Sequence, residues 1–174
     1  MTRTAAREVA VNLIFAAAAN PEMAPEELLD RFFDPEHYKS LSAEGDRFAE
    51  YPDEKQMQYI CAMVEGVCEH CEELNEYIRK YARGWRLERI SRMAAALLRC
   101  AMYEMLYLED VPPAAAINEA VELAKFYEEP ETVSFINGVL GGFARAELNV
   151  EPADAETVPE MPAAETEPET AAEQ

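Results

Sequence analysis

Two segments of the sequence carry residue types that could do chemistry. The first is CEHC, in which Cys68, His70 and Cys71 have a spacing that suggests a zinc site. Four ligands would require Cys100 as well, from a distant part of the chain. Cys68 and Cys71 instead continue an apolar stripe at helical spacing, where free cysteine packs like a small hydrophobic residue. We therefore expect core cysteines, no metal site and no cofactor.

The second segment is the basic stretch RKYARGWRLERISRMAAALLR, residues 79–99. It holds seven of the 15 lysines and arginines against a single acid, Glu88, and Tyr81 and Trp85 lie among the bases. Cations interleaved with aromatic rings suit phosphate contacts and base stacking. The same arginines could equally pair with acids of the protein itself, and composition leaves both interpretations open.

The remaining polar residues do not assemble into a catalytic constellation. His37 lies in an acidic stretch, His70 lies on the cysteine-bearing segment, and Ser134 has no evident base partner. The sequence contains no glycine-rich phosphate loop and no spaced histidine or carboxylate motif for a metal. Paired acids such as Glu72-Glu73 are typical of solvated helix faces. These observations favour a binding protein over an enzyme.

Charge is distributed unevenly along the chain. The 174 residues include 35 acids and 15 bases, for a net charge of −20, and eight of the acids but no base lie in residues 151–174. That segment is rich in Pro, Ala, Glu and Thr, and it cannot bury enough apolar surface to offset its ordering entropy. We therefore expect a folded domain over residues 1–148 and a disordered acidic tail over 149–174. No apolar run approaches the ~20 residues of a membrane span, and we expect a cytoplasmic protein.

Every periodic segment has the helical period, so we predict an all-α bundle with short connections. Residues 34–50 are polar and are expected to be partly irregular. Gly84 is expected to break the chain before the basic segment continues. The predicted helices cover, in chain order, about residues 4–18, 25–33, 52–81, 87–108, 112–127 and 131–146.

The last predicted helix contains a conflict. In FINGVLGGF, residues 135–143, apolar side chains recur at the spacing of one helical face, yet each of the three glycines weakens a helix by about 1 kcal/mol. We expect Gly138 to permit close packing against the preceding helices. We expect Gly141 and Gly142 to mark a frayed helix end.

The first predicted helix has two apolar faces and two early cations. Arg3 and Arg7 stand four residues apart near its N-terminus, where positive charge opposes the helix dipole. An anionic ligand could compensate this charge. Alternatively, the helix is central and buried on both sides, with both arginines reaching solvent.

Four segments together resemble the NusB transcription antitermination family in order and spacing: AREVAVNLIF, GWRLERISRMAAALLRCAMYEM, VPPAAAINEAVELAKFY and FINGVLGGF. The resemblance covers about residues 3–145. It implies a compact double helical bundle without enzymatic activity. It also implies binding of boxA-type RNA together with NusE, a ribosomal small-subunit protein, in a complex that makes RNA polymerase processive on ribosomal RNA operons.

The resemblance assigns roles to individual residues, to which we add three arginines from the basic segment. The residues expected to contact RNA are Arg3, Arg7, Tyr81 and Phe135 by resemblance, and Arg83 from the basic segment. The residues expected to contact the protein partner are Phe15 by resemblance, and Arg89 and Arg92 from the basic segment. Tyr81 and Phe135 could equally be core residues.

The sequence departs from the family pattern at several positions. Its start, TRTAAR, lacks the adjacent arginines common in the family, Val133 and Ser134 replace bases before Phe135, and Ala94-Ala95 replaces an acid–base pair. Fewer cations release fewer counterions, so we expect weaker and less salt-dependent RNA binding that relies on the partner. The alternative is a NusB-like fold kept as a protein-interaction module or homodimer with an eroded RNA surface.

Overall fold

The computed structural model describes residues 1–42 and 48–150, and every regular element within these ranges is helical. This confirms the predicted all-α class. The predicted tail lies outside the described residues, apart from Asn149 and Val150. The elements are α1 (Arg3–Ala19), α2 (Pro25–Phe32), α3 (Pro35–Leu41), α4 (Glu54–Glu69), α5 (Cys71–Tyr81), the 3-10 helix η2 (Leu87–Arg89), α6 (Arg92–Tyr107), α7 (Pro113–Tyr127) and α8 (Pro130–Leu148).

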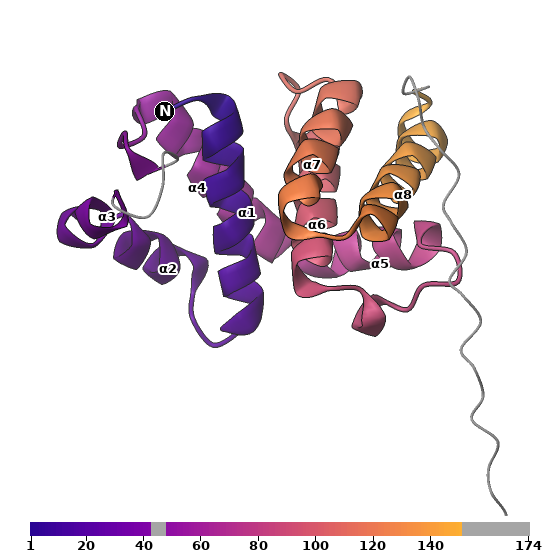
Figure 1. Ribbon diagram of the computed structural model, residues 1–174, viewed down its shortest axis with the longest axis horizontal. Coiled ribbons are helices and arrows are strands. Elements are labelled where there is room, and N and C mark those ends of the chain that lie inside the picture. The colour runs from indigo at the N-terminus through magenta and orange to yellow at the C-terminus, as the bar shows by residue number, and fades with distance from the viewer. Residues whose placement is uncertain (43–47, 151–174) are drawn as a thin grey trace, which may run out of the picture.

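The helices form two groups that meet along α1, α4 and α6 (Figure 1). In the first group α1 packs on α4, α2 packs on both of these helices, and α3 packs on α2. In the second group α6, α7 and α8 pack together, and α5 lies across α6 and α8. The arrangement is the double helical bundle that the sequence predicted.

Helix α1 is the central element of the first group. Thr2 caps it, because its side-chain oxygen accepts a hydrogen bond from the backbone N–H of Ala5 at 3.1 Å. Val9 and Leu13 on one face, and Val11 and Ile14 on the other, are all buried. The interpretation of a helix buried on both sides is therefore confirmed, and α1 can contact both groups.

The single long helix predicted over residues 52–81 is wrong, because the chain bends at His70 between α4 and α5. The backbone of His70 leaves the helical region at φ −95° and ψ 16°. Its ring stacks on Tyr107 with centroids 4.3 Å apart, and its Nδ1 lies 3.0 Å from Glu73. The apolar stripe is continuous in sequence, but α4 packs on α1 whereas α5 packs on α6 and α8, so the two halves must diverge.

The helix predicted from Leu87 is also wrong at its start. Residues 87–89 form only the turn η2, and α6 begins at Arg92 after Ser91, whose side-chain oxygen accepts from the N–H of Ala94 at 3.0 Å. Ser91 is a better N-cap than any residue near Leu87, because its short side chain can reach the free N–H groups of the first turn. Arg89 and Arg92 consequently do not lie on one helical face.

Helix α8 runs without interruption through all three glycines to Leu148. The predicted frayed end at Gly141 and Gly142 is wrong, because Phe143 and Ala144, which follow them, are fully buried and hold the helix in place. The helix ends at Asn149, whose left-handed backbone at φ 53° terminates it.

The glycine that allows the closest approach is Gly66 in α4, which the sequence analysis did not single out. A Cβ atom placed there would lie 2.0 Å from the hydroxyl oxygen of Tyr103 and 2.1 Å from its Cζ atom. The ring of Tyr103 therefore lies directly over the backbone of α4, and Tyr107 stacks on it with centroids 4.9 Å apart. This contact joins α4 to α6 next to the bend at His70.

The cysteines lie within or beside the core. Cys100 is buried, Cys61, Cys68 and Cys71 are half-buried, and all four are free thiols. Within the part of the chain that the structure describes, no group of three or more histidines, cysteines or acidic residues is placed to hold a metal ion. Within the same ranges, no helix combines the length and hydropathy needed to cross a membrane.

We expect Gly66→Ala to destabilise the protein by about 1–3 kcal/mol, because the added methyl group displaces the Tyr103 ring. In a Tyr103→Ala background the sign should reverse, since only the gain in helix propensity of about 1 kcal/mol remains. Gly142→Ala is the matched control, because its Cβ atom would lie 3.6 Å from the ring of Tyr81, an ordinary contact. Urea denaturation measures all four variants, and equal effects of Gly66→Ala in both backgrounds would contradict the packing argument.

Candidate nucleic-acid and partner interface

Arg7 lies inside the protein in a network with two carboxylates. Its Nε donates to both oxygens of Glu104 at 3.1 Å, and its Nη2 donates to Oε1 of Glu104 at 2.8 Å. Its Nη1 donates to Glu119 at 2.9 Å. The side chain of Arg7 is only 5% exposed and that of Glu104 is 0% exposed. We call Arg7, Glu104, Glu119 and Tyr59 the buried arginine network.

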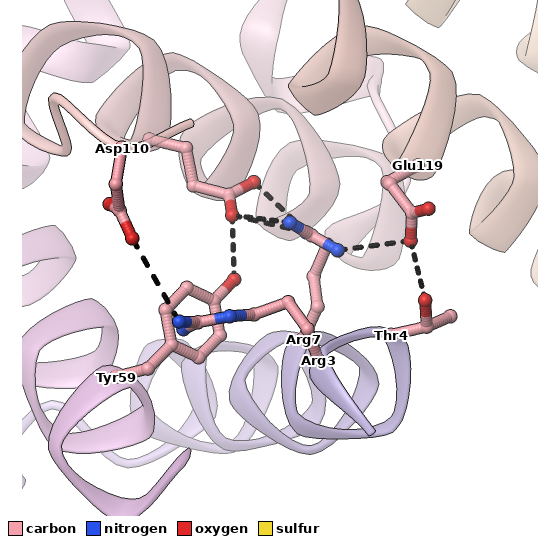
Figure 2. Close-up of polar contacts among 7 residues, drawn as sticks. Arg3, Thr4, Arg7, Tyr59, Asp110 and Glu119 are labelled. Atoms are coloured by element: carbon pink, nitrogen blue, oxygen red, sulfur yellow. Dashed lines mark hydrogen bonds and ion pairs between the residues drawn. The ribbon is translucent and has the colours of Figure 1, made fainter. Parts of the chain in front are cut away.

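Tyr59 connects this network to Arg3, as Figure 2 shows. The hydroxyl of Tyr59 donates to Oε1 of Glu104 at 2.7 Å, and the guanidinium of Arg3 lies 4.0 Å from the centroid of the same ring. A guanidinium over an aromatic face is a cation–π contact. The side chain of Arg3 is 28% exposed, and its Nη2 lies 4.0 Å from Asp110. Arg3 is therefore held at the surface by a ring that the buried network fixes.

The charges in this network stabilise one another. Burial acts to lower the pKa of the Arg7 guanidinium, but the hydrogen bond and charge of Glu104 outweigh it and raise this pKa above its usual value. Burial also raises the pKa of the Tyr59 hydroxyl, and Glu104 raises it further, so Tyr59 stays a donor. The compensation that Arg7 requires near the start of α1 thus comes from internal carboxylates.

This placement revises two expectations for Arg7. The guanidinium does not reach solvent, contrary to one of the sequence-based alternatives, because α6 and α7 bring two carboxylates to it. It also presents no free donor surface to RNA, so Arg7 acts in this structure by supporting α1 and Arg3. The sequence could not show this, because Glu104 and Glu119 are 97 and 112 residues away.

Phe135 and Tyr81 are also mainly core residues. Phe135 is 0% exposed, and the half-buried Trp85 lies against it with ring centroids 4.3 Å apart. Tyr81 is 9% exposed, and its hydroxyl donates to Glu147. The sequence left open whether these two residues contact RNA or belong to the core, and their burial agrees with the core. The ring of Phe135 would have to leave its buried site to contact RNA.

The connection between α5 and α6, residues 82–91, and the first residue of α6, Arg92, together carry four exposed cations of the basic segment, and we call this stretch the cationic connection. Its arginines are Arg83, Arg86, Arg89 and Arg92, and all four are exposed. Among the ion pairs of the described residues, only one includes any of them, a contact of 3.9 Å between Arg86 and Glu88. Such an exposed pair contributes little.

The other three bases of the segment are engaged internally. Arg79 pairs with Glu72 and Glu76, and Lys80 pairs with Glu147. The Nε of the half-buried Arg99 donates to Asn75 at 2.8 Å. Both sequence-based alternatives therefore hold for different parts of the basic segment. The cations at its two ends bind groups of the protein itself, whereas the arginines at its centre remain available for a ligand.

The expected partner residues lie toward the opposite end of α1 from Arg3. Phe15 is half-buried against the core, and Arg89 and Arg92 belong to the cationic connection. The structure adds Phe126 at the end of α7, which is 84% exposed. Sequence analysis missed Phe126, although its position off the apolar face of α7 was a usable signal.

Polar contacts hold this end of α7 beside α1 and α6. Asn12 donates to the hydroxyl oxygen of Tyr127 at 3.2 Å, and that hydroxyl donates to Glu8 at 2.7 Å. Ser91, the N-cap of α6, donates to Glu128. The ring of Phe126 thus projects from a firmly held helix end next to the start of α6. An exposed phenylalanine on a rigid element is a typical anchor for a protein partner.

The fold is that of an all-helical protein, and comparison with known proteins gives its family. The profile of the NusB family matches residues 4–145. A transcription antitermination protein NusB from Acetivibrio thermocellus is 40% identical over 148 residues, covering 85% of this chain and 92% of the relative. One from Carboxydothermus hydrogenoformans is 42% identical over 141 residues, covering 81% and 91%.

A solved structure agrees with this result. T. maritima NusB superposes with a TM-score of 0.69 at 25% identity, over 84% of this chain and 92% of that one. The chain belongs to the NusB family. The segment after Arg145, which includes the acidic tail, lies outside the matched residues.

We expect Glu104→Gln to lower the free energy of unfolding by about 3–5 kcal/mol, because it removes the fully buried carboxylate and leaves Arg7 with only the partly exposed Glu119 as a charged partner. Arg31→Gln is the control, since it removes an ion pair with Glu27 in which both side chains are exposed. That change should cost less than about 1 kcal/mol. Urea denaturation compares the two, and a similarly small loss for both would show that the buried network contributes little.

Proposed function

We propose that this protein is a non-catalytic, cytoplasmic antitermination factor that binds boxA-type RNA together with NusE and promotes processive transcription of ribosomal RNA operons. Its place would be in the antitermination complex on RNA polymerase. Membership of the NusB family supports this proposal, as does the name of its relatives, transcription antitermination protein. The observation that carries it is the set of exposed arginines in the cationic connection, on a chain whose net charge is −20.

RNA binding is assigned here to the cations that remain accessible. Arg3, held over the ring of Tyr59, and Arg83, in the cationic connection, keep the roles expected from the sequence. Arg86 joins them, because its ion pair with Glu88 is long and exposed. Arg7 and Phe135 have supporting roles, since both are buried. Few phosphate contacts imply a shallow dependence of affinity on salt.

Partner binding is assigned to the other end of α1. Phe15, Arg89 and Arg92 are the residues expected from the sequence, and Phe126 offers an apolar anchor near them. An aromatic anchor beside arginines has the composition of protein–protein hot spots. NusE would then lie next to the RNA, because the cationic connection contributes to both surfaces.

The decisive experiment is a salt titration of boxA RNA binding with and without NusE. We expect the mixture to bind RNA more tightly than this protein alone, and log K to fall linearly with log salt concentration. Replacing Arg83 and Arg86 by Gln should reduce affinity at low salt and make the slope shallower by about one to two. Arg31→Gln combined with Lys55→Gln is a control of equal charge. Absence of binding to both RNA and NusE at low salt would rule out the proposal.

The partner surface has its own test. Phe126→Ser should weaken binding of NusE by about tenfold or more, and leave RNA binding in the absence of NusE unchanged, because the ring is an exposed anchor. Phe126→Tyr is the matched control, since it keeps the aromatic ring. Isothermal calorimetry measures the affinity, and equal affinity of the Ser and Tyr variants would remove Phe126 from the interface.

A second candidate function is a protein-interaction module or homodimer whose RNA surface is eroded. The observation that favours it is the burial of Arg7 and Phe135, which leaves fewer groups for RNA. Changing Arg3 and Arg83 to Glu discriminates the two, because it should abolish RNA binding in the first case and leave partner binding unaffected in the second. Analytical ultracentrifugation shows whether the protein dimerises. Arg7 is unsuitable for such a charge reversal, since its loss would disturb folding.

A further inference from the structure

The described chain ends at Val150, close to the cationic connection, and the acidic tail, residues 151–174, follows it in the sequence. Glu147, in the last turn of α8, accepts hydrogen bonds from Nζ of Lys80 and from the hydroxyl of Tyr81, at the end of α5. The bond from Lys80 lowers the pKa of Glu147, which keeps this carboxylate charged. After Leu148 the left-handed Asn149 ends the helix, and the N–H of Val150 donates to Ala144 at 3.2 Å. The described chain therefore ends beside the last turn of α5.

The first exposed arginine of the connection follows closely. Arg83 is two residues after Tyr81, so their Cα atoms lie within about 7.6 Å. The tail has 24 residues and eight acids without a base. Even as a coil, a chain of that length spans on the order of 27 Å, and it is longer when extended. The tail can therefore reach the whole connection from its point of departure.

Charge makes the connection the natural site for this segment. Its four arginines are exposed, and the sole ion pair formed by any of them within the described ranges is the one between Arg86 and Glu88. The flanking cations differ, because Arg79 and Lys80 already have carboxylate partners. Covalent attachment gives the tail a local concentration in the millimolar range, so individually weak pairs can act together.

We propose that residues 151–174 dock on the cationic connection and compete there with RNA phosphates. The contact is intramolecular and salt-sensitive, and RNA displaces it by offering a denser row of negative charge. The tail thereby reduces binding of non-specific RNA and is released when RNA and NusE bind together. The competition rests on the proposed RNA-binding function, whereas docking of the tail does not.

The first test needs no RNA. A full-length variant with all eight tail acids changed to their amides (Asp154→Asn, and Glu→Gln at the other seven) is compared with the unaltered chain by NMR of the arginine Nε–Hε groups. We expect shifts at Arg83, Arg86, Arg89 and Arg92, none at Arg31, and loss of the differences near 1 M salt, where the Debye length is about 3 Å. A full-length chain with a shuffled tail of the same composition should resemble the unaltered protein. Unchanged arginine signals in the amide variant would overturn docking.

The second test measures competition with boxA RNA. The amide variant should bind RNA about three- to tenfold more tightly at low salt, and the two affinities should converge as salt increases. The gain in affinity should disappear when all four arginines of the connection are replaced by Gln. This result would show that the tail acts by docking on these arginines and not by general electrostatic repulsion of RNA. RNA binding that is equal with and without tail charges would overturn competition. If the arginine signals respond but no variant binds RNA, docking stands and the proposed RNA function fails.

Discussion

The buried ion pair between Arg7 and Glu104 constrains the rest of this structure. A guanidinium and a carboxylate removed from water destabilise the fold unless each meets the other in good geometry and their remaining hydrogen-bonding groups are satisfied. Here both oxygens of Glu104 accept hydrogen bonds, and Tyr59 and Glu119 complete the set. These residues come from α1, α4, α6 and α7, so the network joins the two groups of helices and favours the register in which all of its members meet. The same ring of Tyr59 then carries Arg3 at the surface.

The excess of acids over bases in this chain explains which cations remain without a carboxylate partner. With 35 acids and 15 bases, cations on regular helices readily find carboxylates, as Arg79 and Lys80 do. Among the described residues, the exposed arginines that lack a short ion pair lie between the end of α5 and the first residue of α6. Loops held between rigid helices are common sites of binding. The cationic connection has this position, and the described chain ends at Val150 beside one of its ends.

Sequence patterns predicted the local features of this protein well and the contacts poorly. Helices α1, α2, α7 and α8 appear close to their expected bounds, because periodicity and proline positions are local signals. The bend at His70 was missed, since it depends on which helices α4 and α5 meet. Of the candidate site residues, Arg83 is exposed as expected, whereas Arg7 and Phe135 are buried by elements distant in sequence.

The sequence alone therefore determined the helical class, the family resemblance, the excess of negative charge and the concentration of bases between residues 79 and 99. These properties depend on composition and on spacing within one or two turns. Only the tertiary structure decided which cations are neutralised, that Gly66 is the glycine under an aromatic ring, and that Phe126 is exposed. The physical reason is that an ion pair or a packing contact forms between surfaces brought together by the fold, and no local pattern records which surfaces will meet.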